Sequence, residues 1–253
     1  MKKMTMALLA IGFTGFSAIA SANTISYTSN TIADAVNNWS NTLSLTKFNT
    51  NLGTLTGITF TLYGTAQGYV YVQNINTTVT ATATPTVSSQ ITLKDPGSIA
   101  TLVVTTPTLA SGLVSLTTKI NATGVYGGAD SAQLAVGTVS TPVTPGVNVT
   151  TAPAATANVV SSYNTASPLW SYITSQFTAA GTASALLPTS AVGLTTANLS
   201  GGTQNLTTQT SSSAYATVTY SYNLPTVVPE PATLLPMGVG VLGMAFGATR
   251  RKA

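Results

Sequence analysis

The sequence contains no cysteine and no histidine, and only 5% of its 253 residues are charged. Without cysteine there is neither a disulfide framework nor thiol chemistry. Without histidine there is no imidazole base, no Ser-His-Asp triad and no histidine-based metal site. We therefore expect a protein that is stabilised by burial alone and that holds no metal or cofactor.

A hydrolase with two carboxylates is the one familiar catalytic scheme that this composition leaves open. Glu230 lies in a proline motif near the C-terminus and Asp95 lies in an Asp-Pro-Gly turn beside Lys94, which leaves Asp34 and Asp130. One carboxylate at Asp130 is too few for a useful calcium site. We expect Asp34 and Asp130 to be solvated loop acids and predict no catalytic residue. A secreted carbohydrate-active enzyme that uses Asp34 and Asp130 is the alternative.

The formal net charge of +4 arises at the two ends of the chain. The basic residues outnumber the acidic ones only there, at Lys2, Lys3, Arg250, Arg251 and Lys252. Residues 23–228 contain three lysines and three aspartates, so the formal net charge of this part of the chain is three minus three, or zero. A nucleic-acid partner would need a clustered basic footprint, and none is indicated.

The N-terminus has the pattern of a secretory signal peptide. Two lysines precede the apolar stretch MALLAIGFTGFSAIA, and Ala20-Ser21-Ala22 supplies the small residues that signal peptidase requires. We expect residues 1–22 to be removed before Asn23 and the rest of the chain to be exported. An uncleaved anchor is the alternative, but the apolar stretch is short for a membrane span.

Near the C-terminus, residues 232–249 form an uncharged, largely apolar run that is followed at once by Arg250, Arg251 and Lys252. As a helix the run would be about 27 Å long, which just crosses a bilayer, and the basic cluster would stay on the cytoplasmic side. Its four glycines and Pro236 suit a membrane helix better than the alternative, a buried soluble helix.

The order of features over residues 226–253 is similar to a known bacterial sorting signal. Val228, Pro229, Glu230 and Pro231, then the apolar run, then the basic cluster resemble the PEP-CTERM signal of Gram-negative bacteria. The resemblance implies that an exosortase cuts the tail near the proline motif, so that the helix anchors the precursor only transiently in the inner membrane. The mature product would reach the cell surface or the exopolysaccharide matrix.

Between the two signals, hydrophobic residues alternate with polar ones. The alternation includes Trp39, Leu43 and Leu45, the set Ile58, Phe60 and Leu62, and the set Val218, Tyr220 and Tyr222. This period of two predicts half-buried strands, and we expect residues 23–225 to form a single β-sandwich. Breaks are expected at Gly53, Gly57, Gly64 and Gly68, and a turn at Asp95-Pro96-Gly97. Two smaller sandwiches, divided within residues 139–159, are the alternative.

One segment has helical spacing instead. Trp170, Ile173 and Phe177 lie at positions i, i+3 and i+7, with Pro168 at the first helical position and Ser167 as the expected N-cap. We expect a short helix that packs its aromatic side chains into the core at one end of the sandwich. An aromatic platform for a ligand is the alternative.

The stretch NNWSNTLSLTKFNTNLGTLTGITFTLYG, from Asn37 to Gly64, resembles the start of the choice-of-anchor E domain. Later segments fit this family more loosely, including the closing TVTYSYNL from Thr217. The resemblance implies surface display and gives no catalytic residues. We therefore expect an exported structural or interaction protein, with signal peptidase and exosortase as processing partners. Its neutral face of Thr, Ser, Asn and Tyr is suited to contact exopolysaccharide.

Overall fold

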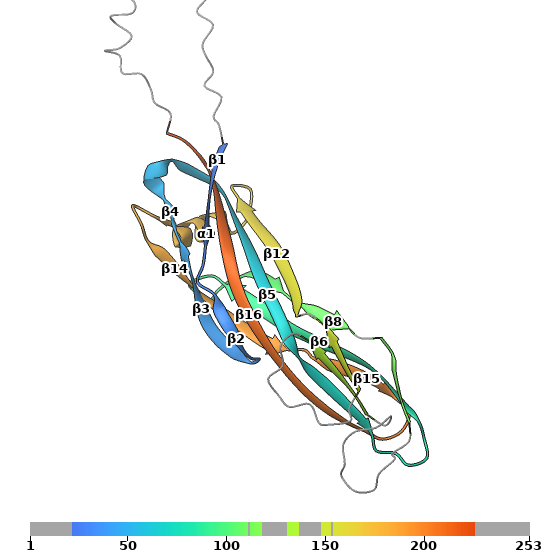
Figure 1. Ribbon diagram of the computed structural model, residues 1–253. Helices are drawn as coiled ribbons and strands as arrows, with labels where there is room; N and C mark the ends of the chain where they lie inside the picture. The colour runs from blue at the N-terminus through green and yellow to red at the C-terminus, as the bar shows by residue number, and fades with distance from the viewer. Residues whose placement is uncertain (1–21, 111, 118–130, 137–147, 153, 226–253) are drawn as a thin grey trace, which may run out of the picture.

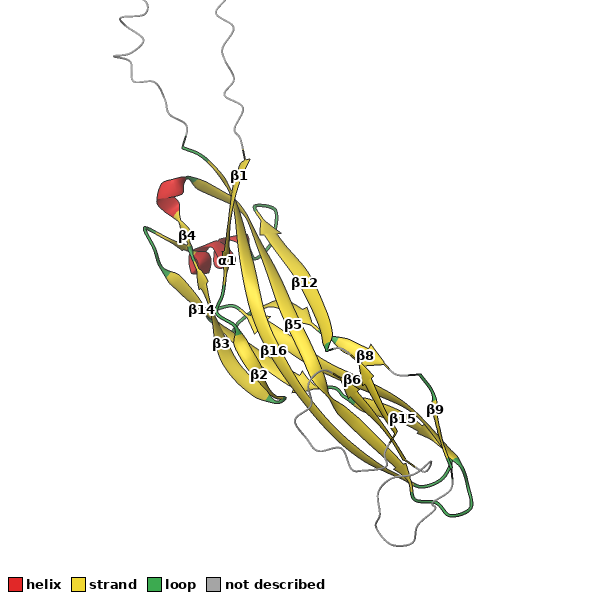
Figure 2. Ribbon diagram, viewed as in Figure 1, coloured by secondary structure: helices red, strands yellow, loops and turns green. Residues whose placement is uncertain are grey.

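The computed structural model describes residues 22–110, 112–117, 131–136, 148–152 and 154–225. These residues form an elongated and mostly β structure with one short α-helix, shown in Figures 1 and 2. Two mainly antiparallel sheets pack against each other as a sandwich. The predicted all-β, sandwich-like class with a single short helix is therefore confirmed for the described part of the chain.

Seven of the described strands make up the first sheet, in which β16 lies between β1 and β5. Its strands are β1 (Ala22–Thr28), β2 (Ile32–Val36), β5 (Thr54–Asn74), β10 (Ser131–Val136), β11 (Asn148–Ala152), β12 (Ala155–Asn164) and β16 (Gln204–Asn223). The strands β2 and β1 both pair with β16, while β12 and β10 pair with successive parts of β5.

The second sheet is built around β6, to which β14 and β15 pair on one side and three short strands on the other. Its described strands are β3 (Trp39–Thr46), β6 (Ala81–Lys94), β7 (Thr101–Thr105), β8 (Thr108–Ala110), β9 (Val114–Leu116), β14 (Ser184–Gly193) and β15 (Thr196–Ser200). A small pair, β4 (Phe48–Asn49) and β13 (Thr178–Ala179), and the 3-10 turn Thr50–Leu52 lie beside them.

The antiparallel pair β5 and β16 runs along the long axis of the molecule (Figure 1). At about 3.3 Å per residue, the 21 residues of β5 extend over about 70 Å. At one end, Ala22 of β1 pairs with Asn223 of β16, so the chain enters and leaves the domain at the same place. At the other end, Asn74 pairs with Gln204.

The alternating residues predicted from the sequence do face the interior. Ile58, Phe60 and Leu62 of β5 are fully buried, as are Leu43 and Leu45 of β3. Each such side chain contributes about 1.5–3 kcal/mol by leaving water. Burial of alternate side chains is what holds each strand in register, because a slip by one residue would expose the whole apolar set.

Three of the four glycines that were expected to break the first strands do not break them. Only Gly53 precedes β5, whereas Gly57, Gly64 and Gly68 lie inside that strand. The reason is the packing of the two sheets rather than a turn. A Cβ atom on Gly64 would lie 2.7 Å from Cδ1 of Ile91 on β6, so glycine is needed there for close approach.

The buried apolar side chains form two clusters along the sandwich. The larger contains Leu62 and Ile91, and the smaller contains Val70 and Val87. Strands β5 and β6 pass through both clusters. Within residues 139–159, where a boundary between two sandwiches was the alternative, the described parts are the strand β11 and the start of β12.

The predicted helix is present as α1 (Trp170–Phe177). Ile173 and Phe177 are fully buried. The ring of Phe177 packs edge-on against that of Phe60, with 4.8 Å between the ring centroids. The N-cap assignment was wrong, because the cap residue is Leu169 and no side chain caps the helix. The hydroxyl of Ser167 instead accepts a hydrogen bond from the backbone N–H of Asn164, at 3.0 Å.

Candidate functional site

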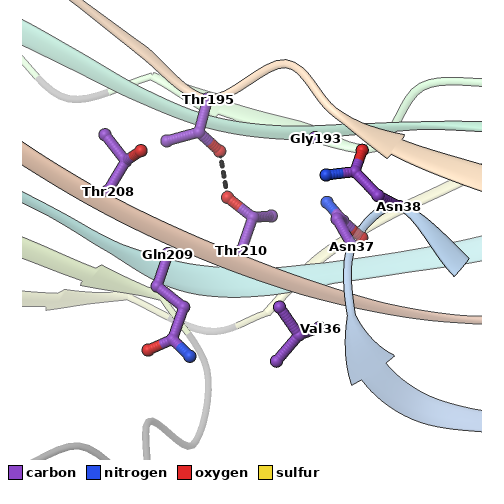
Figure 3. Close-up of a pocket in the computed structure, with 8 residues that line it drawn as sticks. All are labelled: Val36, Asn37, Asn38, Gly193, Thr195, Thr208, Gln209 and Thr210. Atoms are coloured by element: carbon purple, nitrogen blue, oxygen red, sulfur yellow. Dashed lines mark hydrogen bonds between the residues drawn. The ribbon is translucent and has the colours of Figure 1, made fainter.

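A polar pocket of about 230 Å³ lies where the chain passes between the two sheets. Its lining comes from three places (Figure 3): Val36 at the end of β2 with Asn37 and Asn38 after it, Gly193 at the end of β14 with Thr195 after it, and residues 208–210 of β16. None of the residues that line it is ionisable. The pocket is therefore suited to an uncharged polar ligand.

The pocket adjoins a polar layer that separates the two apolar clusters. Ser88 and Ser89 lie on β6 between Val87 and Ile91, which belong to different clusters. On β16, Thr210 and Ser212 are buried in the same region. Buried hydroxyls need hydrogen-bond partners, and this layer supplies them from both sheets.

Two backbone hydrogen bonds fix the β2–β3 connection against both sheets. The N–H of Asn37 donates to the carbonyl of Thr210 on β16, and the N–H of Asn38 donates to the carbonyl of Ala191 on β14, each at 2.9 Å. Asn38 has a φ of 72°, a left-handed conformation that Asn adopts more readily than most residues. The two Asn side chains are thereby held at the pocket.

The orientation of the Asn37 amide follows from a short chain of hydrogen bonds. The indole N–H of Trp39 can only donate, and it donates to Oγ of Ser212 at 3.0 Å. The Ser212 hydroxyl then donates to Oδ1 of Asn37 at 2.6 Å. Oδ1 also accepts from the hydroxyl of Ser89, at 3.3 Å. The oxygen of the amide therefore faces the polar layer, and Nδ2 points away from it.

The Nδ2 atom of Asn37 is buried and has no hydrogen-bond partner in the described structure. In Figure 3 the amide nitrogens of Asn37 and Asn38 both lie on the side nearer to Thr195 and Thr210. A Cβ atom at position 193 would lie 3.2 Å from Nδ2 of Asn37, so the glycine leaves room for the amide at this place. A buried donor without a partner costs about 1–3 kcal/mol, which an acceptor in the pocket would recover.

Two threonines form the opposite wall of the pocket. The hydroxyl of Thr195, in the β14–β15 connection, is hydrogen-bonded to that of Thr210 on β16 (Figure 3). Oγ1 of Thr195 also accepts from the backbone N–H of Ser88, at 3.2 Å. Because Thr195 is held by the backbone of β6, its hydroxyl is fixed in direction before any ligand arrives.

Of the two acids considered for catalysis, the structure describes only Asp34. Asp34 lies on β2, where its Oδ2 accepts from Gln67 Nε2 at 2.6 Å and from Ser211 Oγ at 2.8 Å. Asp130 lies outside the described residues. Across the described residues, no group of three or more acidic side chains is placed to hold a metal ion.

Asp95, which the sequence places in a turn beside Lys94, is a buried residue. It is fully buried in the predicted Asp-Pro-Gly turn, where the N–H of Ser98 donates to its carbonyl at 2.9 Å. Its carboxylate accepts hydrogen bonds from the hydroxyl of Tyr172 at 2.5 Å and from the N–H of Gly97 at 2.8 Å. It is therefore a structural residue that joins this turn to α1.

Most residues of the predicted processing signals lie outside the described residues. These are Ala20, the motif Val228 to Pro231, the run 232–249 and the cluster Arg250 to Lys252. Ala22 and Asn23, on either side of the expected cleavage point, pair with Asn223 and Tyr222. In the part of the chain that the structure describes, no helix has the length and apolar character needed to cross a membrane.

The pocket residues were not identified from the sequence. Asn37 and Asn38 stand out only as an Asn pair directly before Trp39. Thr195, Thr208 and Thr210 are indistinguishable from the many other threonines of the chain. Their role depends on contacts between segments that are far apart in sequence.

Comparisons with known proteins do not identify a related protein of known function. No family model matches the chain, and no curated protein matches it. Among solved structures, the chain is similar to the infectious bursal disease virus Gt strain structure, with 12% identity over 88% of this chain and 47% of that chain and a TM-score of 0.16. A mutant VP2 protein of the same virus gives 8% identity, 88% and 46% coverage and a TM-score of 0.18.

The chain thus spans about half the length of these viral structures. TM-scores this low do not establish a shared fold. The resemblances to the PEP-CTERM signal and to the choice-of-anchor E domain stay predictions.

Proposed function

We propose that this protein is exported and sorted by an exosortase, and that it acts at the cell surface or in the exopolysaccharide matrix as a structural or interaction protein. The observation that best supports the proposal is the pairing of Ala22 with Asn223. The predicted signal peptide and the predicted membrane tail would both join the domain at the same end. Cutting both signals would then leave the domain intact.

The elongated shape supports a role in display. In a precursor held by residues 232–249, the C-terminal end of β16 would lie next to the membrane, because that strand ends only a few residues before the tail. The connections at residues 75–80 and 201–203 would lie at the far end of β5, about 70 Å away. The domain would thus present that end and the pocket to the surroundings.

The outward face of the first sheet supports contact with a neutral, hydrated matrix. Across β1 and β16, Ser26 and Thr219 share a hydrogen bond of 2.8 Å, and across β5 and β12, Thr59 and Ser162 share one of 2.9 Å. These side chains form one row across the four strands. Hydroxyl rows of this kind interact with water and with sugars without depending on ionic strength.

Mass spectrometry of the native protein is expected to show an N-terminus at Asn23 and loss of the apolar tail. Deletion of residues 229–231 removes the proposed exosortase motif, so the precursor is expected to accumulate in the inner membrane. Deletion of residues 201–203, at the far end of the domain, serves as a control that leaves both signals intact. Mature protein that retains Arg250 and Arg251 would contradict the proposal.

The proposal gives the protein no enzymatic role. Glycoside hydrolysis needs a proton donor and a base or nucleophile about 5–10 Å apart, and loss of either slows the reaction by orders of magnitude. We expect the unaltered chain to release no reducing ends from the host's own exopolysaccharide, and Asp34→Asn combined with Asp130→Asn to leave surface retention unchanged. Reducing ends that disappear in the double variant would instead establish the carbohydrate-active enzyme.

A further inference from the structure

We propose that the pocket beside Asn37 binds one uncharged sugar unit of a polysaccharide. The inference rests on the proposed function, because it names the matrix component that the domain would contact. The binding itself depends only on groups in the pocket.

The first argument is the unpartnered amide nitrogen. The Trp39–Ser212–Asn37 hydrogen bonds fix the amide so that Nδ2 cannot exchange places with Oδ1 without losing the acceptor for Ser212. Nδ2 therefore offers two N–H groups and has no partner among the described residues. The ligand must supply an oxygen acceptor, and sugar hydroxyls do so.

The second argument is the chemistry of the remaining walls. The inward-facing part of the lining offers the hydroxyls of Thr195, Thr208 and Thr210 and the amide of Asn38. Hydroxyls both donate and accept, which matches a ligand with many hydroxyls of its own. No lining residue carries a charge that would favour a phosphate or a uronic acid.

The third argument is size. Pockets for drug-sized ligands typically measure about 300–1,000 Å³, and this pocket measures about 230 Å³. It has space for a single sugar ring and not for an extended oligosaccharide. Such a site binds weakly on its own, in the millimolar range that corresponds to about −4 kcal/mol, and becomes effective when many copies contact one polymer.

Saturation-transfer NMR on the purified full chain tests the proposal, in a detergent without a sugar head group. The probes are glucose, galactose, mannose and N-acetylglucosamine, each at millimolar concentration. We expect transfer to at least one of these four sugars. If the folded protein gives transfer to none of them, the pocket holds water only and the proposal is overturned.

Three variants test whether the sugar binds in this pocket. Asn37→Asp keeps the oxygen that faces Ser212 but removes the N–H donors, so affinity is expected to fall about fivefold or more. Thr208→Val removes a hydroxyl that lines the pocket and is expected to weaken binding about threefold. Thr207→Val changes the neighbouring residue, which pairs with Tyr71 in register on the outward face, and is expected to have no effect.

Binding that survives unchanged in both Asn37→Asp and Thr208→Val would overturn the assignment to this pocket. Circular dichroism of each variant shows whether the β structure is retained, and Thr208→Val decides the question if Asn37→Asp does not fold. The outcome is separate from that of the processing experiment. A chain that binds sugar but keeps its tail would refute exosortase sorting alone.

Discussion

Gly68→Ala is expected to destabilise the protein by about 3–5 kcal/mol, the largest effect of any single substitution proposed for this chain. Gly68 lies within β5 at a φ of 152°, which L side chains rarely adopt. A Cβ atom there would lie 2.1 Å from the carbonyl oxygen of Gln209 on the paired strand β16. The backbone would have to move, and the long ladder between β5 and β16 would be disturbed at this position.

Denaturant unfolding of the full chain, followed by circular dichroism and tryptophan fluorescence, measures this loss. Gly57→Ala is the matched control, because it places the same methyl group in the same strand with its nearest neighbour at an ordinary 3.5 Å. Its effect is expected to stay within about 1 kcal/mol. Equal destabilisation by the two substitutions would contradict the close approach of β5 and β16 at Gly68.

Asp95→Ala is expected to cost about 2–4 kcal/mol in the free energy of unfolding. The carboxylate is buried and accepts hydrogen bonds from the N–H groups of Gly97 and Ala100 and from the hydroxyl of Tyr172. Alanine would leave these donors without their partner in a place that water reaches poorly. Tyr172→Phe removes one donor only and is expected to cost less than Asp95→Ala.

The same carboxylate makes stability depend on pH. Burial raises the pKa of Asp95, but the hydrogen bonds from Tyr172 and from the N–H groups of Ala100, Gly97 and Ile99 together lower it more, so the pKa lies below its ordinary value. A carboxyl group with a lower pKa in the folded state stabilises the fold fully above its unfolded pKa, about 3.9. That contribution is lost as the pH falls through the folded pKa.

Unfolding measured from pH 7 downward is therefore expected to show a loss of stability below about pH 4 that is smaller in Asp95→Asn. Asp34→Asn serves as the comparison, because Asp34 is exposed on β2. If the acid-induced loss were the same in the unaltered chain and in Asp95→Asn, the carboxylate would not have the structural role assigned to it.

Elements that depend on a local pattern of apolar or turn residues could be predicted from the sequence. These are the strands around Phe60 and Tyr220, the helix at Ile173 and the Asp95 turn. The sequence did not allow β5 to be recognised as one strand. Glycine within a short window indicates a break, whereas Gly68 is required by the carbonyl of Gln209, far away in the sequence. The burial of Asp95 depends in the same way on Tyr172.

The pocket could not be predicted for the same physical reason. Whether an Asn amide is paired or open depends on its neighbours in space, and the partners of Asn37 come from β6 and β16. Among so many threonines, those that line a pocket have no distinguishing local pattern. Only the folded arrangement separates Thr210 from its neighbours on the same strand.

The place of β16 within the first sheet bears on the proposed export of the chain. Because β16 lies between β1 and β5, the strand made last completes the ladder begun by the strand made first. The sheet cannot close until residues up to 223 are available, so the fold has high contact order and forms slowly. Under the proposed export, a chain that cannot complete its first sheet before residue 223 emerges would stay unfolded during translocation and would fold only after crossing the membrane.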